Sequence, residues 1–174
     1  MAPSIAWRFA PFAELIPREV HDLYQLRAAA FVVEQKCAFQ DVDGVDPECW
    51  HLLGYGPSPR PSPKAEGELL AYSRLVPPGT KFAEPSIGRV ITATAVRRTG
   101  MGRELMRESL ARAEKLWPNR AIRIGAQRHL ERFYMDFGFV TASEPYDEDG
   151  ILHIEMLRPA STIAGRSAQL AGQK

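Results

Sequence analysis

The sequence predicts one mixed α/β domain with a mostly antiparallel central sheet flanked by helices. The chain has 174 residues, of which 45% are hydrophobic, so it is long enough to bury one sizeable core. Strand-like segments lead into helical patterns, and hairpin-like strand pairs stand toward both ends of the chain. We therefore expect a single domain over residues 1–158, followed by a flexible tail over residues 159–174.

The first half of the chain is predicted to contain a strand, a helix and a hairpin. Residues 5–9 form the candidate strand, and a helix begins at Pro17, after which apolar residues recur every three or four positions. Residues 51–55 and 69–76 are two further strands. The segment between them, residues 57–68, carries prolines that cannot pair in a sheet. We expect this segment to be an exposed, mobile loop inserted in the domain.

The second half of the chain is predicted to alternate strands with helices. The expected strands cover residues 87–93, 121–126, 139–140 and 151–157. A long helix over residues 100–117 has one apolar face and ends before Pro118. A short helix follows the second of these strands, and Gly138 suits its C-terminal cap.

Composition argues against several classes of function. Lys and Arg total 22 and Asp and Glu total 21, so the formal net charge of +1 gives no basic excess for nucleic-acid binding. No apolar run reaches the roughly 18 residues that a membrane span needs, and no signal-peptide pattern is present. Cys37 and Cys49 lack the spacing of a redox or zinc motif. We expect a cytoplasmic protein without a metal, a membrane anchor or a nucleic-acid partner.

The sequence Arg97-x-x-Gly100-x-Gly102 lies between a predicted strand and the long predicted helix. The first N–H groups of a helix lack intrahelical partners, and the helix dipole adds partial positive charge there. Glycines at 100 and 102 let a ligand approach the main chain closely. The motif therefore favours a phosphate site, with a plain strand-to-helix turn as the alternative. Its spacing matches neither a Walker loop nor a dinucleotide-binding fingerprint.

Together with a second motif, this turn resembles the GCN5-related N-acetyltransferase (GNAT) family. The matching residues are Arg97, Gly100 and Gly102 in the family's R/Q-x-x-G-x-G/A turn, and Tyr134, Gly138 and Phe139 in its Y-x-x-x-G-F element. Further segments are similar to the ElaA-like branch: residues 26–27, 31–37, 40–46, 51–52, 87–90, 125–130 and 149–154. The resemblance spans about residues 20–157 and implies the GNAT fold.

The resemblance also implies acetyl-CoA, or coenzyme A, as the cofactor. Its pyrophosphate would bind at the glycine turn, and its pantetheine arm would enter a gap between two splayed strands. The expected cofactor contacts are Val90, Ile91, Thr92, Arg97, Arg98, Thr99, Gly100, Met101, Gly102, Arg103, Gln127, Phe133 and Tyr134. A main-chain N–H near Thr92 would stabilise the developing oxyanion. Gln127 is alternatively a helix cap.

Four residues are expected to be catalytic, namely Tyr134, Glu34, His51 and His153. A tyrosine hydroxyl stays protonated at neutral pH and can donate to a departing thiolate, so Tyr134 is the candidate acid, with a plain core aromatic as the alternative. The base is left open among the other three residues. The histidines are alternatively structural sheet residues.

The acceptor site is expected to contain Glu34, Asp41, Asp43 and His51. An acidic pocket would favour a cationic, lysine-like or polyamine-like amine, although Asp41 and Asp43 are alternatively solvated turn residues. We expect an acetyl-CoA-dependent N-acetyltransferase that acetylates a primary amine of a small molecule or peptide by direct attack. A non-catalytic acyl-CoA sensor or interaction module is the alternative, and a synthase of acylated amino-acid signals ranks last. A homodimer is possible, but no residue specifies it.

Overall fold

The structure is a computed structural model that describes residues 4–37, 39–57 and 67–160. Most of the predicted proline-rich loop lies outside the described residues, as does the predicted tail beyond residue 160. Within the described ranges, no helix is both long and apolar enough to cross a membrane.

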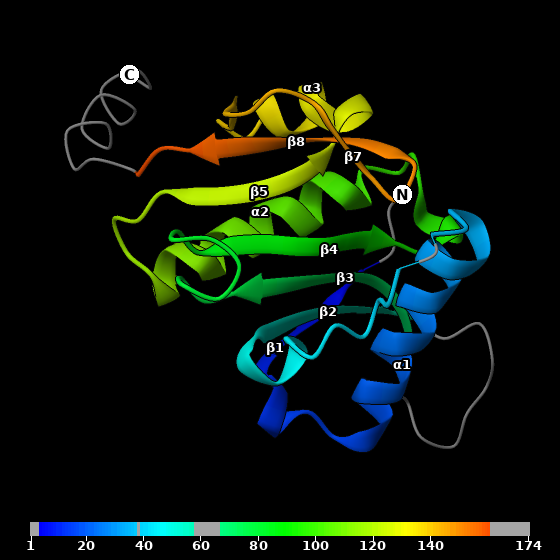
Figure 1. The fold of residues 1–174 in the computed structure, drawn as a ribbon. Helices are drawn as coiled ribbons and strands as arrows, with labels where there is room; N and C mark the ends of the chain where they lie inside the picture. The colour runs from blue at the N-terminus through cyan, green and yellow to red at the C-terminus, as the bar shows by residue number, and fades with distance from the viewer. Residues whose placement is uncertain (1–3, 38, 58–66, 161–174) are drawn as a thin grey trace, which may run out of the picture.

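One sheet forms the centre of the structure (Figure 1). Its strands are Ala6–Pro11 (β1), Trp50–Gly56 (β2), Glu68–Val76 (β3), Ser86–Thr92 (β4), Ile122–Gln127 (β5), Val140–Thr141 (β6), Tyr146–Glu148 (β7) and Ile151–Arg158 (β8). The 8-stranded sheet has the order β1-β2-β3-β4-β5-β8-β6, and β7 pairs with β8. Of these pairs, β4 with β5 is parallel and the others are antiparallel. The predicted mixed, mostly antiparallel sheet is confirmed.

Three α-helices flank the sheet, and sequence signals explain their limits. They are Pro17–Arg27 (α1), Met101–Leu116 (α2) and Glu131–Met135 (α3). Proline suits the first position of α1, and the Glu19 carboxylate caps this end by accepting a hydrogen bond from the Ile16 N–H at 3.0 Å. Pro118 lies just beyond the end of α2. The helix α1 continues into the π-helical segment Ala28–Glu34 (η2), a geometry that often marks functional sites.

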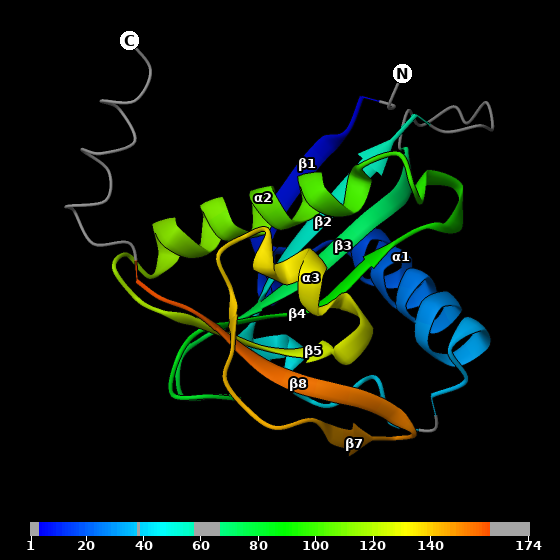
Figure 2. The same ribbon diagram turned by 90° about the horizontal axis from the view of Figure 1, so that it is seen from above.

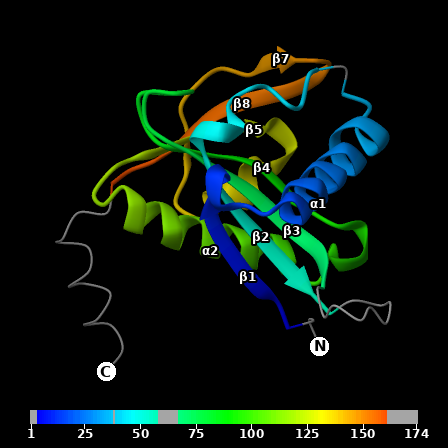
Figure 3. The ribbon, with the colours of Figure 1, turned by 90° about the horizontal axis from the view of Figure 1, so that it is seen from below.

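Helices α1 and α2 lie on opposite faces of the sheet, as Figures 2 and 3 show from above and below. The core under α2 includes Leu105 and Met106, which pack toward Ile124 of β5. The core under α1 includes Leu23 and Ile91. Each face of the sheet is therefore closed by its own hydrophobic layer.

Strands β4 and β5 separate soon after they meet. Their only registered pair among the described residues is Ser86 with Arg123. Beyond this pair the two strands diverge toward their carboxyl ends (Figure 1). The splayed gap that the resemblance implied is thus present, and the edge of β4 that faces β5 lacks a strand partner over most of its length.

A bulge interrupts β4 beside this gap. The register between β3 and β4 shifts between Tyr72 and Arg74, and Arg89 has a φ of 51°. This left-handed conformation costs a non-glycine residue about 1–2 kcal/mol, so the surrounding contacts must hold it in place.

Strand β7 and its hairpin with β8 are absent from the sequence prediction. The turn between them contains Asp149 and Gly150, with φ values of 53° and 81°. These values suit a type I′ hairpin turn, for which Asp-Gly is a preferred pair. The signal was therefore available in the sequence.

Candidate active site

The glycine turn for which we predicted an anion site lies at the start of α2. Gly100 caps the helix with a φ of 95°, in the left-handed region that favours glycine. The N–H groups of Met101 and Gly102 have no hydrogen-bond partner among the described residues. A Cβ on Gly100 would meet no heavy atom within 4 Å, so the main chain faces open space. These free donors at the positive end of a 16-residue helix fit a phosphate group.

The side chains of the turn differ in what they offer a ligand. Arg98 is exposed, and Arg103 donates a hydrogen bond to the Asp136 carboxylate at 2.5 Å. Met101 is 1% exposed, so its side chain belongs to the core and only its main chain faces the turn. The Thr99 hydroxyl donates to the Val96 carbonyl at 2.7 Å.

Arg97 is paired with Glu34, from the end of η2. The Arg97 Nη1 and Nη2 atoms donate to Glu34 Oε1 and Oε2 at 2.6 and 2.7 Å. The hydrogen bond from Arg97 holds the pKa of Glu34 below its usual value. Both oxygens of this carboxylate are occupied and it resists protonation, so the structure gives Glu34 little capacity to act as a base.

The unpaired edge of β4 runs along Val90, Ile91 and Thr92. Val90 packs toward α2, whereas Ile91 belongs to the core under α1. The side chains therefore point to the two faces, and the main chain of these residues borders the splayed gap. This arrangement fits a ligand arm that pairs with main-chain amides, as expected for Val90, Ile91 and Thr92.

Tyr134 and Phe133 lie on α3, which begins at Glu131 shortly after β5 ends at Gln127. Tyr134 is 8% exposed and packs edge-on against Phe133 and Phe139, with ring centroids 5.1 and 6.0 Å away. Burial raises the pKa of Tyr134 to about 12. Its hydroxyl is thus firmly protonated at neutral pH. A Cβ on Gly102 would lie 3.9 Å from the Phe133 ring, which places this ring next to the anion turn.

Gln127 joins the end of β5 to the end of η2. Its Nε2 atom donates to Gln35 Oε1 at 3.0 Å. Gln127 does occupy the position before a short 3-10 turn, Arg128–Leu130 (η5), but its side chain makes no capping hydrogen bond. The alternative role as a helix cap is therefore wrong.

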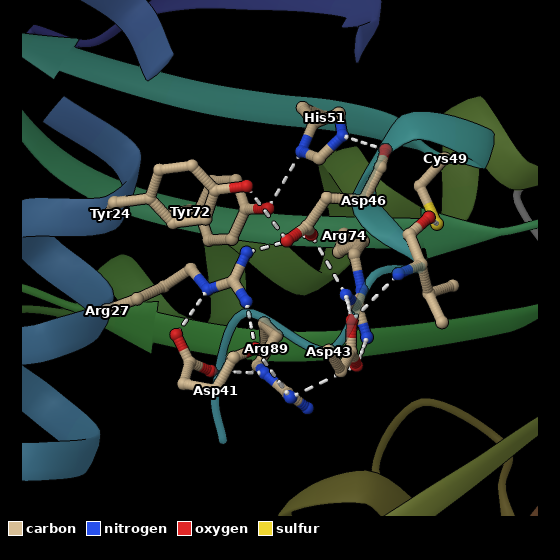
Figure 4. Close-up of polar contacts among 11 residues, drawn as sticks. Tyr24, Arg27, Asp41, Asp43, Asp46, Cys49, His51, Tyr72, Arg74 and Arg89 are labelled. Carbon is tan, nitrogen blue, oxygen red and sulfur yellow. Dashed lines mark hydrogen bonds and ion pairs between the residues drawn. The ribbon is translucent and has the colours of Figure 1, made fainter. Parts of the chain in front are cut away.

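Three arginines and three aspartates form an ionic network beneath α1 (Figure 4). The members are Arg27, Arg74, Arg89, Asp41, Asp43 and Asp46. Arg27 bridges Asp41 and Asp46, each at 2.8 Å. Arg74 bridges Asp43 and Asp46, at 2.7 and 2.8 Å. Arg89 reaches Asp41 and Asp43, at 2.7 and 3.3 Å, and these contacts hold its strained backbone in the bulge.

This network corrects the expectation of an acidic acceptor pocket. Its charges balance, and Asp41 and Asp43 are both paired with arginines. Burial works to raise the pKa of Asp46, but hydrogen bonds from Arg74 and Arg27 outweigh it and hold that pKa below its usual value. Asp46 therefore stays ionised, and the network fixes residues 41–46 against β3 and β4. Asp41 is not a solvated turn residue, whereas Asp43 is exposed and also accepts a hydrogen bond from the Val45 N–H at 3.1 Å, which agrees with the turn-residue alternative.

His51 is also part of this interior, which argues against its expected roles as base and acceptor ligand. It is 0% exposed, and its Nδ1 and Nε2 atoms lie 2.8 Å from the Tyr72 hydroxyl and 3.0 Å from the Asp46 carbonyl (Figure 4). Burial lowers the pKa of His51. Both ring nitrogens are occupied and no solvent reaches the ring, so His51 matches the alternative of a structural histidine.

His153 lies on β8 opposite Gln127 of β5. Its side chain is 14% exposed, its Nδ1 atom is 2.8 Å from the Ile151 carbonyl, and its Nε2 atom is 3.6 Å from Glu148 Oε2. The Tyr146 ring stacks on it at 6.1 Å. His153 therefore faces the same side of the sheet as the Gln127 side chain, near the open end of the gap.

Sequence reasoning missed the arginines that organise this region, above all Arg74. Its position inside the apolar strand β3 was an available signal, because an arginine that is 3% exposed requires partners. Tyr146 and Gln35 carried no pattern of their own. Their roles arise from contacts between segments far apart in the chain.

Comparison with known proteins assigns the chain to a family. A model of the acetyltransferase (GNAT) domain matches residues 66–158, just over half of the 174 residues. The chain belongs to the GNAT acetyltransferase family. Protein ElaA of Escherichia coli K12 is 39% identical over 156 residues, which cover 88% of this chain and 96% of ElaA. The expected ElaA-like branch is therefore confirmed.

Solved structures agree with this GNAT assignment. An acyl-CoA N-acyltransferase from Pseudomonas aeruginosa matches with a TM-score of 0.79 and 41% identity, covering 89% of this chain and 99% of that one. The crystal structure of E. coli ElaA matches with a TM-score of 0.78 and 38% identity over the same shares. A Bacillus subtilis acetyltransferase solved in complex with CoA shares the fold, with a TM-score of 0.61 at 17% identity. The predicted GNAT fold, the acetyltransferase class and the acetyl-CoA cofactor are confirmed.

Proposed function

We propose that this GNAT acetyltransferase transfers an acetyl group from acetyl-CoA to a primary amine of a small molecule or peptide, by direct attack in a ternary complex. The observation that carries the proposal is the splayed β4 edge next to an unpaired helix start. The two features would hold the two ends of one donor, the pyrophosphate on the turn and the thioester arm in the gap. Bound acetyl-CoA supplies the activated acetyl group.

The chain's main-chain atoms do most of the donor binding in this proposal. The N–H groups of Met101 and Gly102 donate hydrogen bonds to the pyrophosphate, and the exposed Arg98 side chain adds a positive charge beside it. Val90, Ile91 and Thr92 pair with the amides of the arm. A main-chain N–H beside the bulge or near Thr92 donates to the oxygen of the acetyl thioester as negative charge develops on that oxygen.

Tyr134 is the proposed general acid. A donor must hold its proton until the leaving group needs it, and burial raises the pKa of Tyr134 to about 12. Its helix follows β5, which forms one wall of the gap. The same tyrosine packs in the core, so the acid role concerns its hydroxyl and the packing role concerns its ring.

His153 is the proposed base for the incoming amine. Its Nδ1 atom is within hydrogen-bond distance of the Ile151 carbonyl, which accepts a hydrogen bond from Nδ1–H, and its Nε2 atom lies 3.6 Å from the Glu148 carboxylate. Glu34 is tied to Arg97, and His51 is enclosed. Of the three candidates from the sequence, His153 alone combines partial exposure with a ring nitrogen, Nε2, that is outside hydrogen-bond distance of its carboxylate neighbour.

Release of free CoA thiol, measured with a panel of primary amines, tests the function. The wild-type protein is expected to release thiol with at least one amine, and Tyr134→Phe is expected to lower the rate by roughly 10²-fold. Calorimetric titration with CoA is the control, since Tyr134→Phe should bind CoA as the wild type does. Binding without release for every amine would instead indicate a non-catalytic acyl-CoA-binding module.

A further inference from the structure

Lys81 lies in the loop between β3 and β4 and reaches over β5 at a position without a side chain. A Cβ placed on Gly125 would come within 3.8 Å of Lys81 Nζ and 3.3 Å of the Tyr146 hydroxyl oxygen. The space over Gly125 is thus bordered by an ammonium group and a phenol. Neither group has a role in the function proposed above.

This position is the point where the gap between β4 and β5 begins. Ser86 and Arg123 form the registered pair, and two residues farther along each strand come Gly88 and Gly125. In parallel strands, residues two positions beyond a pair face the same side as that pair. A Cβ on Gly88 would meet no heavy atom within 4 Å. The closed end of the gap therefore has two glycines on one face, with open space at Gly88 and with Lys81 and Tyr146 over Gly125.

That face is the one turned away from α2. Arg74 pairs with Gly88 across β3 and β4, and the Arg74 side chain enters the network beneath α1. An acyl donor whose pyrophosphate sits at the start of α2 would carry its thioester along the β4 edge toward this closed end. The Lys81 amine approaches the same end from the face turned away from α2. An acceptor amine must reach the thioester from this side, because the donor enters from the start of α2.

The surroundings of Lys81 favour a reactive amine. Lys81 is exposed as a residue, but desolvation at its ammonium end lowers the pKa of Lys81. Arg89 and Arg74 also lower this pKa, whereas Glu148 and Asp43 oppose the shift. The Lys81 Nζ atom lies over the Phe82 ring, 5.4 Å from the ring centroid. More of the neutral amine is therefore present than at an ordinary surface lysine.

We propose that the enzyme acetylates its own Lys81 when no amine acceptor occupies the site. The inference rests on the proposed function, because the acetyl group comes from acetyl-CoA. Lys81 Nζ forms a bond to the acetyl carbon as the carbon–sulfur bond breaks. Tyr134 gives a proton to the sulfur, which keeps the bonding electron pair. Water takes the surplus proton from Nζ and returns one to Tyr134, so the products are acetyl-lysine and CoA thiol.

The modification would also limit the enzyme. Acetylation removes the Lys81 charge and places an amide over Gly125, in the space where an acceptor amine must approach. A modified enzyme is therefore expected to turn over external amines more slowly than the unmodified enzyme. High amine concentration should in turn protect Lys81.

Intact-protein mass spectrometry with peptide mapping, on the full chain incubated with acetyl-CoA, tests the proposal. We expect one acetyl group per chain, located on Lys81. The first-order rate constant of its formation should not depend on protein concentration. Lys81→Arg should stay unmodified. The matched control Lys115→Arg, which changes an exposed lysine of α2, should react as the wild type does. Tyr134→Phe should slow the modification by roughly 10²-fold if the active site performs it.

Three outcomes would overturn the proposal: acetyl groups spread over many lysines, a rate that rises with protein concentration, or an unmodified Lys81. CoA binding and amine turnover alongside an unmodified Lys81 would reject this inference and leave the proposed function standing. Absence of CoA binding by calorimetry would reject both. As an independent readout, pH-dependent labelling with acetic anhydride should show Lys81 reacting at lower pH than Lys115.

Discussion

Glu34 and Arg97 connect the end of η2 to the segment before α2 through a bidentate ion pair, with contacts of 2.6 and 2.7 Å. Glu34 ends the segment that extends α1, and Arg97 precedes the glycine turn. Both side chains are partly exposed, at 46% and 39%. The pair thus brings the end of η2 into contact with the site that we propose for the pyrophosphate.

This pair gives a first prediction about donor affinity. Glu34 occupies the guanidinium that a pyrophosphate would otherwise attract, so Glu34→Gln should tighten CoA binding, by about 2- to 5-fold for an exposed pair. Arg97→Ala should weaken binding about 10-fold through loss of a charge-assisted contact. Calorimetric titration with CoA measures both changes. Weaker binding by Glu34→Gln would mean that the pair holds Arg97 in its binding position instead.

The two glycines of the turn give a second prediction, because they differ in conformation. Gly102 lies inside α2, where a Cβ would make ordinary contact with Phe133 at 3.9 Å. Gly102→Ala should therefore preserve stability or raise it by up to about 1 kcal/mol. It should nevertheless weaken CoA binding, because the methyl group would stand beside the free N–H groups. Equal CoA affinity for this variant and the wild type would exclude the pyrophosphate from this turn.

Gly100 serves as the matched comparison. Its φ of 95° strains any other residue, so Gly100→Ala should lower the free energy of unfolding by about 1 kcal/mol. Urea unfolding of both variants separates the backbone effect from the effect on binding.

The sequence was sufficient for most of the sheet, the main helices and the glycine turn before α2, because each has a local signal. The Pro17 start and the Pro118 stop mark helix ends directly, and Arg97, Gly100 and Gly102 lie where the spacing placed them. Strand β7 was missed because three exposed residues, Tyr146–Glu148, show no alternating pattern. Its Asp-Gly turn was the one cue.

The chemistry of Asp41, Asp43 and His51 was less predictable, for a physical reason. Acidic residues in a loop suggest a negative pocket only while their partners are unknown. Here the partner of Asp43 is Arg74, 31 residues away, and the partner of His51 is Tyr72 on the neighbouring strand. Such pairings depend on tertiary packing, and no local pattern reports them.

The ionic network gives a third prediction, about stability. Asp46 is 1% exposed and accepts hydrogen bonds from Arg27, Arg74 and Tyr24. Asp46→Asn would remove the negative charge that two buried arginines share. It should therefore lower the free energy of unfolding by about 3–5 kcal/mol. The control is Asp136→Asn, which removes an exposed pair with Arg103 and should change it by less than about 1 kcal/mol. Similar losses from both variants, measured by urea unfolding, would contradict a buried role for Asp46.

The last prediction concerns pH, and it follows from His51. Burial lowers the pKa of His51, so the unfolded chain, with a histidine pKa near ~6.5, binds the proton first as the pH falls. Stability should therefore decline from about pH 7 downward, until the pH reaches the lower folded pKa of His51. Asp46, whose pKa the neighbouring arginines hold down, should add a second decline below about pH 4.

Unfolding in urea at a series of pH values measures both declines. His51→Gln should remove the first and keep the second, because glutamine does not titrate. The control His129→Gln changes an exposed histidine and should retain the two-step profile. A His51→Gln profile that still declines between about pH 7 and 5 as steeply as the wild type would place the linked proton on another group.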